Sequence, residues 1–365
     1  MKSAITAIGT ALPSYRLPRA IVAESHVVAL RAEGALETRI KAIHRASGIQ
    51  TRYSVIPDFL QNGHDPSLFS KGFTDPFPGT DARMEVYRRT ALPLAKQAVS
   101  QAFEQRNLPR ESITHVVIVS CTGMYAPGLD IDLVTSLGLS ANVHRTAINF
   151  MGCYGAFPAM KVANAFCKSD PKAKVLIVCV ELCSLHFQQA TDEDTLLAMA
   201  LFGDGAAALL VESAEDQPRL EMEAFHTGLA PEGHNDMAWK IGDLGFEMKL
   251  SSYVPKVIEG GIAPLTQGLM QALDMELDQV NHFAIHPGGR SILQAIEAQL
   301  SLSPAQNHHA YEVLKECGNM SSPTVLFVLQ RVWNAMQGAE SGAPILSFAF
   351  GPGLTLESSL FTYHP

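Results

Sequence analysis

Charged residues are scarce in this sequence, and long apolar runs are missing from it. Charged residues make up 17% of the 365 residues and hydrophobic residues 47%, a balance typical of a well-buried globular chain and not of a disordered one. The net charge is −9, and no run of Lys and Arg exceeds two residues, so we expect no nucleic-acid partner. No stretch of about 18 uninterrupted apolar residues occurs, so we expect no membrane insertion.

The six cysteines show no metal-ligand pattern. Cys179 and Cys183 are four residues apart, but no His or Cys pair follows at the spacing of a zinc site. We therefore expect no metal site and a reduced, cytoplasmic protein. The apolar stretch within residues 1–13 alternates and ends too early for a signal peptide, so it is predicted to form the first strand.

Short apolar runs alternate with helical segments along the chain, which favours an α/β fold. The two halves repeat this scheme, and Glu, Asp, Gln and Pro accumulate between them, near residues 212–219. We therefore predict a duplicated αβαβα sandwich of five layers, with halves 1–215 and 216–365. The predicted strands are 115–121, 145–150, 174–181, 205–212, 282–286, 344–350 and 354–362, and the predicted helices are 154–168, 257–273, 291–300 and 322–336.

Cys153 lies where a β-like run ends at glycine and a helical pattern begins, in Asn149-Phe-Met-Gly-Cys-Tyr-Gly-Ala-Phe-Pro158. At a helix N-terminus, unpaired backbone N–H groups and the helix dipole favour an anion. The position therefore predicts a thiolate, which is the nucleophilic form of cysteine.

Two polar residues stand at similar junctions in the second half. His286 ends a predicted strand ahead of Pro287-Gly-Gly289, at the strand end where open α/β sheets bind ligands. Asn319 lies in a polar turn ahead of a predicted helix, and on its own it indicates turn or N-cap chemistry. Imidazole activates a thiol, and His and Asn donors can hold a thioester enolate. Together with Cys153, the pair predicts carbon–carbon bond formation on thioesters.

A papain-like protease also uses Cys, His and Asn, but its local cysteine motif is absent.

Longer motifs in this order and spacing carry a family resemblance along essentially the whole chain. The sequence resembles the type III polyketide synthases, the chalcone and stilbene synthase family of the thiolase superfamily, in a bacterial-like form. The matching stretches are Ala7-Ile-Gly-Thr10, Cys121-Thr-Gly with Pro127-Gly128, Gly152-Cys153, Leu201-Phe-Gly-Asp-Gly205, Ile285-His-Pro-Gly-Gly289, Gly318-Asn-Met-Ser-Ser322 and Phe350-Gly-Pro-Gly353.

The resemblance implies a thiolase-like fold and a role for each catalytic residue. Cys153 would carry the acyl chain, while His286 and Asn319 would hold the malonyl thioester during decarboxylation and stabilise the enolate. Phe202 would be the aromatic gate between the CoA tunnel and the cavity. The substrates would be an acyl-CoA starter and malonyl-CoA, with no other cofactor and no acyl-carrier protein. A homodimer is expected, although Ala126 replaces a methionine that crosses the interface in plant members.

The resemblance also places CoA contacts and cavity residues. Arg39, Lys41 and Arg45 would contact CoA on a basic helix, although the spacing agrees only in part and the three are equally consistent with a solvated helix face. Cys121 and His186 replace cavity threonines, Met248 a second gating phenylalanine and Trp239 a glycine that widens the cavity. Other residues at cavity positions of the family are Glu181, Ser321, Gly351 and Pro352.

Bulky Trp239 and His186 predict a small starter and a short product, closed to a pyrone or a phenolic ring. The alternative is a long-chain acyl-CoA starter that yields an alkylpyrone or alkylresorcinol.

Three other interpretations share the fold: a 3-oxoacyl-ACP synthase III-like enzyme, a hydroxymethylglutaryl-CoA synthase-like enzyme and a non-catalytic scaffold. The ketoacyl synthase has an Asn motif after its His and lacks the Gly-Pro-Gly ending found here. The hydroxymethylglutaryl-CoA synthase needs a catalytic acid, for which this sequence has no clear candidate. A scaffold would not need the three polar residues.

Overall fold

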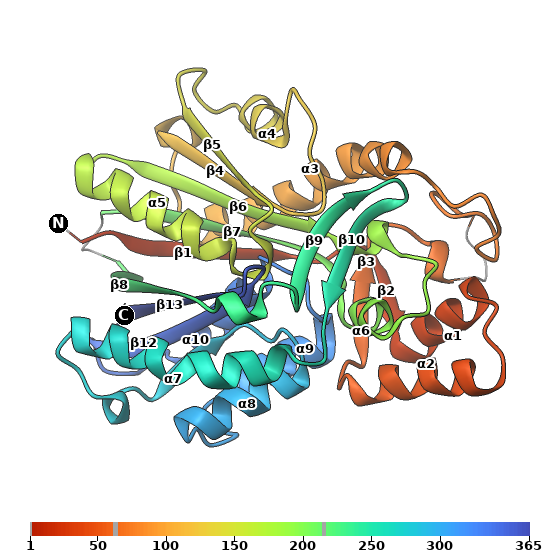
Figure 1. The fold of residues 1–365 in the computed structure, drawn as a ribbon. Helices are drawn as coiled ribbons and strands as arrows, with labels where there is room; N and C mark the ends of the chain where they lie inside the picture. The colour runs from red at the N-terminus through yellow and green to blue at the C-terminus, as the bar shows by residue number, and fades with distance from the viewer. Residues whose placement is uncertain (1, 61–64, 214–216) are drawn as a thin grey trace.

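The computed structural model describes residues 2–60, 65–213 and 217–365. Within these residues, nine strands form one mixed sheet, and two short hairpin-like pairs lie beside it (Figure 1). The sheet strands are β1 (Ala4–Ala11), β4 (His115–Ser120), β5 (His144–Asn149), β6 (Lys174–Leu182), β7 (Asp204–Glu212), β8 (Arg219–Leu229), β11 (His282–Ile285), β12 (Ala343–Gly351) and β13 (Thr355–His364). The short pairs are β2 (Tyr15–Pro18) with β3 (Thr51–Ser54) and β9 (Met237–Gly242) with β10 (Gly245–Leu250).

The sheet consists of two halves of similar topology, one of four strands and one of five. Its order is β11-β12-β13-β8-β1-β7-β6-β4-β5, and β1 joins β8 only through the pairs of Ala4 with Glu221 and Ile5 with Leu220. On either side of this join, a parallel pair (β4 with β6, β11 with β12) continues into antiparallel pairs. The duplicated α/β fold is therefore confirmed. The predicted boundary between 215 and 216 lies outside the described residues.

The described chain contains ten helices, most of which pack on the two halves of the sheet, while three lie to one side of it (Figure 1). Both faces of β4 and β6 are buried, which explains their continuous apolar runs. Val117 and Ile177 face the middle of the molecule, while Ile118 and Val178 pack toward the outer layer. The helices are α1 (Arg19–Ala29), α2 (Gly34–Ala46), α3 (Thr80–Gln105), α4 (Leu129–Leu137), α5 (Ala156–Ser169), α6 (Glu193–Leu201), α7 (Val254–Ala272), α8 (Arg290–Leu300), α9 (His308–Cys317) and α10 (Thr324–Ala335).

Helices α5 and α10 form the central layer between the two halves of the sheet. Helix α5 contacts β4, β6, β7 and β13, and α10 contacts β1, β7, β11 and β12. The segment Thr324–Leu329 of α10 is buried on every side, as expected for a helix without a polar face. Helices α3 and α4 form one outer layer, and α7 and α8 the other (Figure 1).

The predicted helices and strands agree with the structure to within a few residues, with one informative difference at Cys153. The helix predicted from residue 154 starts at Ala156, because Gly152–Tyr154 forms a separate 3-10 turn ahead of it. All six cysteines are buried and unpaired. None of the described helices is long and apolar enough to cross a membrane.

Candidate active site

One cavity brings together the three polar residues predicted to be catalytic. It encloses about 570 Å³ and is lined by Cys153 ahead of α5, His286 after β11 and Asn319 ahead of α10. The central helices therefore deliver two of the three side chains, one from each half of the fold. Further predicted residues on this lining are Phe202, Cys121, Trp239, Met248, Ser321 and Pro352.

The turn that carries Cys153 depends on a glycine and on a second thiol. Gly152 has φ +75°, and a Cβ there would lie 2.4 Å from Cδ of Pro352, so both the backbone conformation and the space require glycine. The Gly152 N–H donates to Sγ of Cys121 at 2.9 Å. Cys121 thus both lines the cavity and holds the turn that carries Cys153.

The amide of Asn319 is held in one orientation by its neighbours. Its Oδ1 accepts from the backbone N–H of Ser321 at 2.8 Å, and its Nδ2 donates to the carbonyl of Gly288 at 3.3 Å. Nδ2 also lies 3.8 Å from Sγ of Cys153. An N–H donor is therefore fixed beside the sulfur, where a bound thioester oxygen can accept from it.

His286 is the unsatisfied polar group of the cavity. The side chain is 1% exposed, and neither ring nitrogen has a hydrogen-bond partner within the described parts of the chain. Leaving such a group unpaired is costly, which points to a ligand as its partner. Burial lowers the pKa of His286 to about 3, so the ring is neutral and offers one donor and one acceptor.

Burial also decides the state of Cys153, and here the sequence-based expectation of a thiolate was wrong for the free protein. Burial raises the pKa of the thiol to about 12, although hydrogen bonds with Ser321 and Asn319 oppose the shift. The helix N-terminus does not compensate for the loss of hydration. The thiol proton must therefore be taken up by a base when the sulfur attacks.

Trp239 forms a wall of the cavity, and His186 packs against it with the two rings edge to face. Trp239 donates its indole N–H to the carbonyl of Cys121 at 2.7 Å. His186 donates from Nε2 to the carbonyl of Thr122 at 2.6 Å and accepts from the Phe246 N–H at Nδ1, so it is neutral, and burial lowers its pKa to about 3. The His186 and Phe246 rings stack at 4.4 Å. Both predicted wall residues are thus fixed by hydrogen bonds.

A second cavity of about 600 Å³ lies beyond this wall. It shares Cys183, Phe202, Trp239 and Met248 with the first cavity. His186 lines this second cavity and not the first. The sequence reasoning missed Cys183, although its place two residues after Glu181 at the end of β6 was a usable signal. The cavity's other lining side chains are apolar, such as Leu17, Val22, Phe59, Phe187 and Met199, and polar, such as His26, Arg52 and Gln188.

Glu181 and Gly351 belong to neither cavity lining among the described residues. The Glu181 carboxyl lies behind the wall, where it accepts from the Cys121 N–H at 2.9 Å and from the hydroxyls of Thr122 and Ser322 at 2.8 and 2.7 Å. It thereby links the Cys121 segment to the Asn319 turn. The sequence reasoning had assigned it to substrate and had missed Thr122 and Ser322.

Glu181 should make stability depend on pH. Burial raises its pKa from 4.5 to about 7, so the fold favours the neutral form. That contribution is complete below pH 4.5 and is lost as pH rises through about 7. Relative to Glu181→Gln, which does not titrate, the wild-type free energy of unfolding should fall by roughly 2 to 3 kcal/mol between roughly pH 5 and 9. Denaturant titrations of both proteins across this range measure the difference, and parallel curves would contradict the prediction.

The predicted CoA contacts lie on the exposed side of α2, outside both cavities. Arg39 pairs with Glu193 at 3.0 Å, and Lys41 pairs with Glu37 at 2.6 Å and Glu24 at 3.3 Å. Arg45 is exposed on the same helix. A CoA phosphate would therefore compete with existing surface ion pairs.

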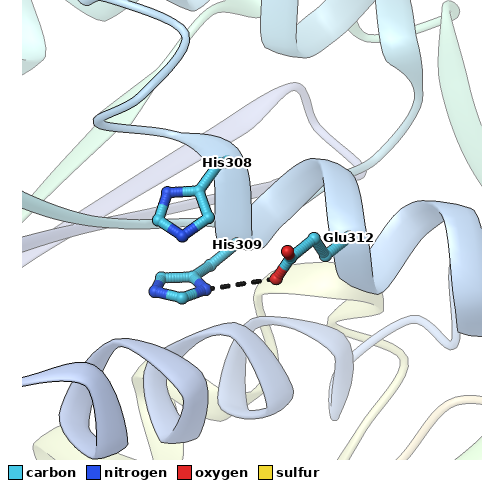
Figure 2. Close-up of side chains that lie close together, drawn as sticks. All are labelled: His308, His309 and Glu312. Carbon is cyan, nitrogen blue, oxygen red and sulfur yellow. Dashed lines mark hydrogen bonds and ion pairs between the residues drawn. The ribbon is translucent and has the colours of Figure 1, made fainter.

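A separate surface cluster was not foreseen from the sequence. His308, His309 and Glu312 converge at the start of α9 (Figure 2), with potential ligand atoms within 4.8 Å of one another. The spacing of His, His and Glu at i, i+1 and i+4 was its signal. His309 Nδ1 lies 3.4 Å from the Glu312 carboxylate, which Arg331 also approaches to 3.4 Å. Since Arg331 supplies a cation at the same carboxylate, the cluster is a surface ion-pair network.

Comparisons with known proteins agree with this geometry. Residues 1–215 match the N-terminal domain of chalcone and stilbene synthases, and residues 221–363 match the C-terminal domain. The alpha-pyrone synthesis polyketide synthase-like Pks18 of Mycobacterium tuberculosis is 31% identical over 94% of this chain and 88% of its own. Type III polyketide synthase 21 of Oryza sativa subsp. japonica is 30% identical over 98% and 93%. The crystal structure of PKS-I from the brown alga Ectocarpus siliculosus superposes with a TM-score of 0.93 at 29% identity, covering 100% of this chain and 98% of that one.

Proposed function

Since the chain belongs to the chalcone and stilbene synthase family and is a type III polyketide synthase, we propose that Cys153, His286 and Asn319 carry out its reaction. Such enzymes join malonyl-CoA units to an acyl-CoA starter. The convergence of the three side chains in one buried cavity supports the assignment. The family membership favours this function over the ketoacyl synthase, hydroxymethylglutaryl-CoA synthase and scaffold alternatives.

In the loading step, Sγ of Cys153 attacks the thioester carbonyl of the starter acyl-CoA. Neutral His286 accepts the thiol proton and passes it to the departing CoA sulfur, so a new thioester forms on Cys153 as the old one breaks. Burial lowers the pKa of His286, so the ring is neutral at neutral pH and has one unprotonated nitrogen that can accept the proton as the sulfur attacks. Burial makes the base necessary, because the thiol is protonated beforehand.

In the condensation step, the carbonyl oxygen of malonyl-CoA accepts hydrogen bonds from His286 and from Nδ2 of Asn319. Breaking the bond to the carboxylate releases CO₂ and leaves its electron pair on the thioester as an enolate, which the two donors stabilise. The enolate carbon attacks the acyl thioester, forms the carbon–carbon bond and releases the Cys153 sulfur. The electrons for the new bond come from decarboxylation, so the reaction requires no redox or metal cofactor. Arg39, Lys41 and Arg45 are the proposed contacts for the CoA phosphates.

The starter we propose is a small acyl group, and the product a short chain closed to a pyrone or phenolic ring. Support comes from the wall of Trp239 and His186, whose hydrogen bonds to Cys121 and Thr122 hold both rings in place. A rigid wall limits the chain that the first cavity can hold. The printed name of the Mycobacterium relative, alpha-pyrone synthesis, favours the pyrone. Mass spectrometry of products from a panel of starters tests this proposal.

Truncation of Trp239 should join the two cavities. In Trp239→Ala the indole between them is lost, and the ratio of kcat/KM for octanoyl-CoA to that for acetyl-CoA should rise by about tenfold or more. Steady-state kinetics with both starters measure the ratio. Trp333→Ala removes the other tryptophan, which lines neither cavity, and should leave the ratio unchanged. An unaltered ratio in Trp239→Ala would show that the wall does not select the starter.

One observation favours a second candidate, the long-chain alkylpyrone or alkylresorcinol synthase. The cavity beyond the wall shares Phe202 and Met248 with the first cavity, so a shift of Trp239 would open it to an acyl tail, which could pack on Leu17, Val22 and Phe59. A wild-type preference for palmitoyl-CoA over acetyl-CoA would establish this candidate and overturn the small starter.

We also propose a homodimer formed across β5. This strand is at the edge of the sheet, and edge strands of stable proteins are covered or paired. Large apolar side chains are exposed nearby in sequence, at Met124, Ile131 and Met151. Light scattering after gel filtration should give twice the chain mass of 39.4 kDa, and Met151→Glu should shift the protein toward monomer. A wild-type monomer at micromolar concentration would contradict the proposal.

A further inference from the structure

Arg52 on β3 is a buried arginine bound to the end of another element. It is 3% exposed. Its Nη1 donates to the carbonyls of Met199 at 2.8 Å and Phe202 at 3.0 Å, and its Nη2 donates to the carbonyl of Ala200 at 2.7 Å. These carbonyls stand at the C-terminus of α6, where helix carbonyls lack partners and a cation is favoured. One guanidinium therefore fixes the backbone that carries Phe202.

The same backbone is joined to Asn319 on its other side. The Gly203 N–H donates to the Asn319 carbonyl at 2.9 Å, and the Asn319 N–H donates to the Leu201 carbonyl at 3.0 Å. A Cβ on Gly203 would lie 3.1 Å from the Cys317 carbonyl and 3.2 Å from Cβ of Arg52. Residues 201–203 are thus enclosed between Arg52 and the Asn319 turn, so displacement of the α6 end must displace Asn319.

A histidine pair extends this network to helix α2. Arg52 Nη2 lies 3.4 Å from Nδ1 of His44, and His44 Nε2 lies 2.8 Å from Nδ1 of His26. Because arginine can only donate, His44 accepts at Nδ1 and donates from Nε2 to His26. Both histidines are buried, while Arg39 on the exposed side of α2 pairs with Glu193 in the first turn of α6. Helix α2 therefore contacts both ends of α6.

We propose that Arg52 is a positioning residue that holds the Phe202 gate and Asn319 in register, and that His44 links this pair to helix α2. The proposal rests on the functions proposed above for Phe202 and Asn319. Arg52 acts through backbone carbonyls and not on the reacting atoms. Cys153 lies in the turn ahead of α5, which this network does not include, so loss of Arg52 should impair decarboxylation much more than acylation.

The test compares two half-reactions in Arg52→Lys, because an ammonium group cannot reproduce the guanidinium's several fixed bonds. CO₂ release from malonyl-CoA should fall by about 10- to 100-fold, as expected when a catalytic group is displaced by about 1 Å. The rate of Cys153 acylation, measured by mass spectrometry of the intact protein, should fall by less than about threefold. His44→Leu keeps the three carbonyl bonds and should lower CO₂ release by only about threefold.

Arg83→Lys is the matched control. Arg83 is equally buried and donates to the carbonyls of Leu185 and Phe187, so its loss costs stability without touching α6. The ratio of decarboxylation to acylation should stay at the wild-type value in Arg83→Lys and fall in Arg52→Lys. A wild-type ratio in Arg52→Lys, or an equal fall in both variants, overturns the proposal.

Two further variants keep the outcome decisive. If Arg52→Lys does not fold, Gly203→Ala presses on the same segment from within and should lower the same ratio, and an unchanged ratio there overturns the proposal. Asn319→Ala distinguishes a failure of the function proposed for Asn319 from a failure of the positioning role of Arg52. Full decarboxylation by Asn319→Ala would refute the function proposed for Asn319. If Asn319→Ala loses decarboxylation while Arg52→Lys retains it, only the positioning role of Arg52 is refuted.

Discussion

Asn319→Ala should lower CO₂ release from malonyl-CoA by about 10²- to 10³-fold, the usual cost of one preorganised donor to a developing oxyanion. The loss is expected to be large because the amide is held in one orientation by the Ser321 N–H and the Gly288 carbonyl. Water that enters the space would have to be ordered anew in each turnover. Acylation of Cys153 from a starter acyl-CoA should remain within about threefold of wild type, because the thiol and its proposed base His286 are both retained.

Asn307→Ala provides a matched comparison. Asn307 is also 1% exposed, and its Nδ2 donates to Glu297 away from both cavities. This variant should lose stability and retain decarboxylation. Radiometric or coupled CO₂ assays of the two variants, at equal folded fraction by circular dichroism, give the contrast. A decrease of less than tenfold in Asn319→Ala would remove Asn319 from the decarboxylation step.

Cys153→Ala should show the reverse pattern. Chain extension of an acyl-CoA starter should fall by at least about 10³-fold, because no other group can hold the acyl chain as a thioester beside the enolate. Decarboxylation of malonyl-CoA should continue, since His286 and Asn319 remain. Products are measured by liquid chromatography and mass spectrometry, and the covalent acyl adduct by the mass of the intact protein.

Cys167→Ala is the control for the cysteine. That thiol is buried and free like Cys153, but it lines neither cavity. Extension should therefore persist in Cys167→Ala. An acyl adduct on Cys153→Ala protein, or undiminished extension by it, would assign the nucleophile to another residue. The opposite responses of Asn319→Ala and Cys153→Ala would together separate the loading step from the decarboxylation step.

The fold and the three central residues could be predicted because local patterns mark them. A strand that lies between two helical layers has no polar face, so 115–121 and 174–181 are recognisable as buried strands. Cys153, His286 and Asn319 each stand where an apolar pattern changes into a helix or turn, and backbone geometry alone places them at the ends of elements. These are short-range properties of the chain.

The remaining properties depend on long-range packing, which one sequence does not encode locally. The thiol state of Cys153 was mispredicted because burial by distant segments outweighs the helix N-terminus. Glu181 was assigned to the cavity because the resemblance places it at a cavity position of the family, and that match does not reveal that its carboxyl is held by Cys121, Thr122 and Ser322. The second cavity is built from residues as distant as Leu17 and Met248, and no spacing in the sequence indicates it.

The repeated topology has a consequence for how such an enzyme can arise and be altered. In the proposed mechanism, the nucleophile comes from the first repeat, and the donors that stabilise the carbanion come from the second. Each repeat then supplies a different half of the chemistry, so neither is a smaller version of the enzyme. Exchange of one repeat between relatives would pair a sulfur with donors from another protein. Recombination should therefore succeed more readily at the walls of the pocket than along the seam where the repeats meet.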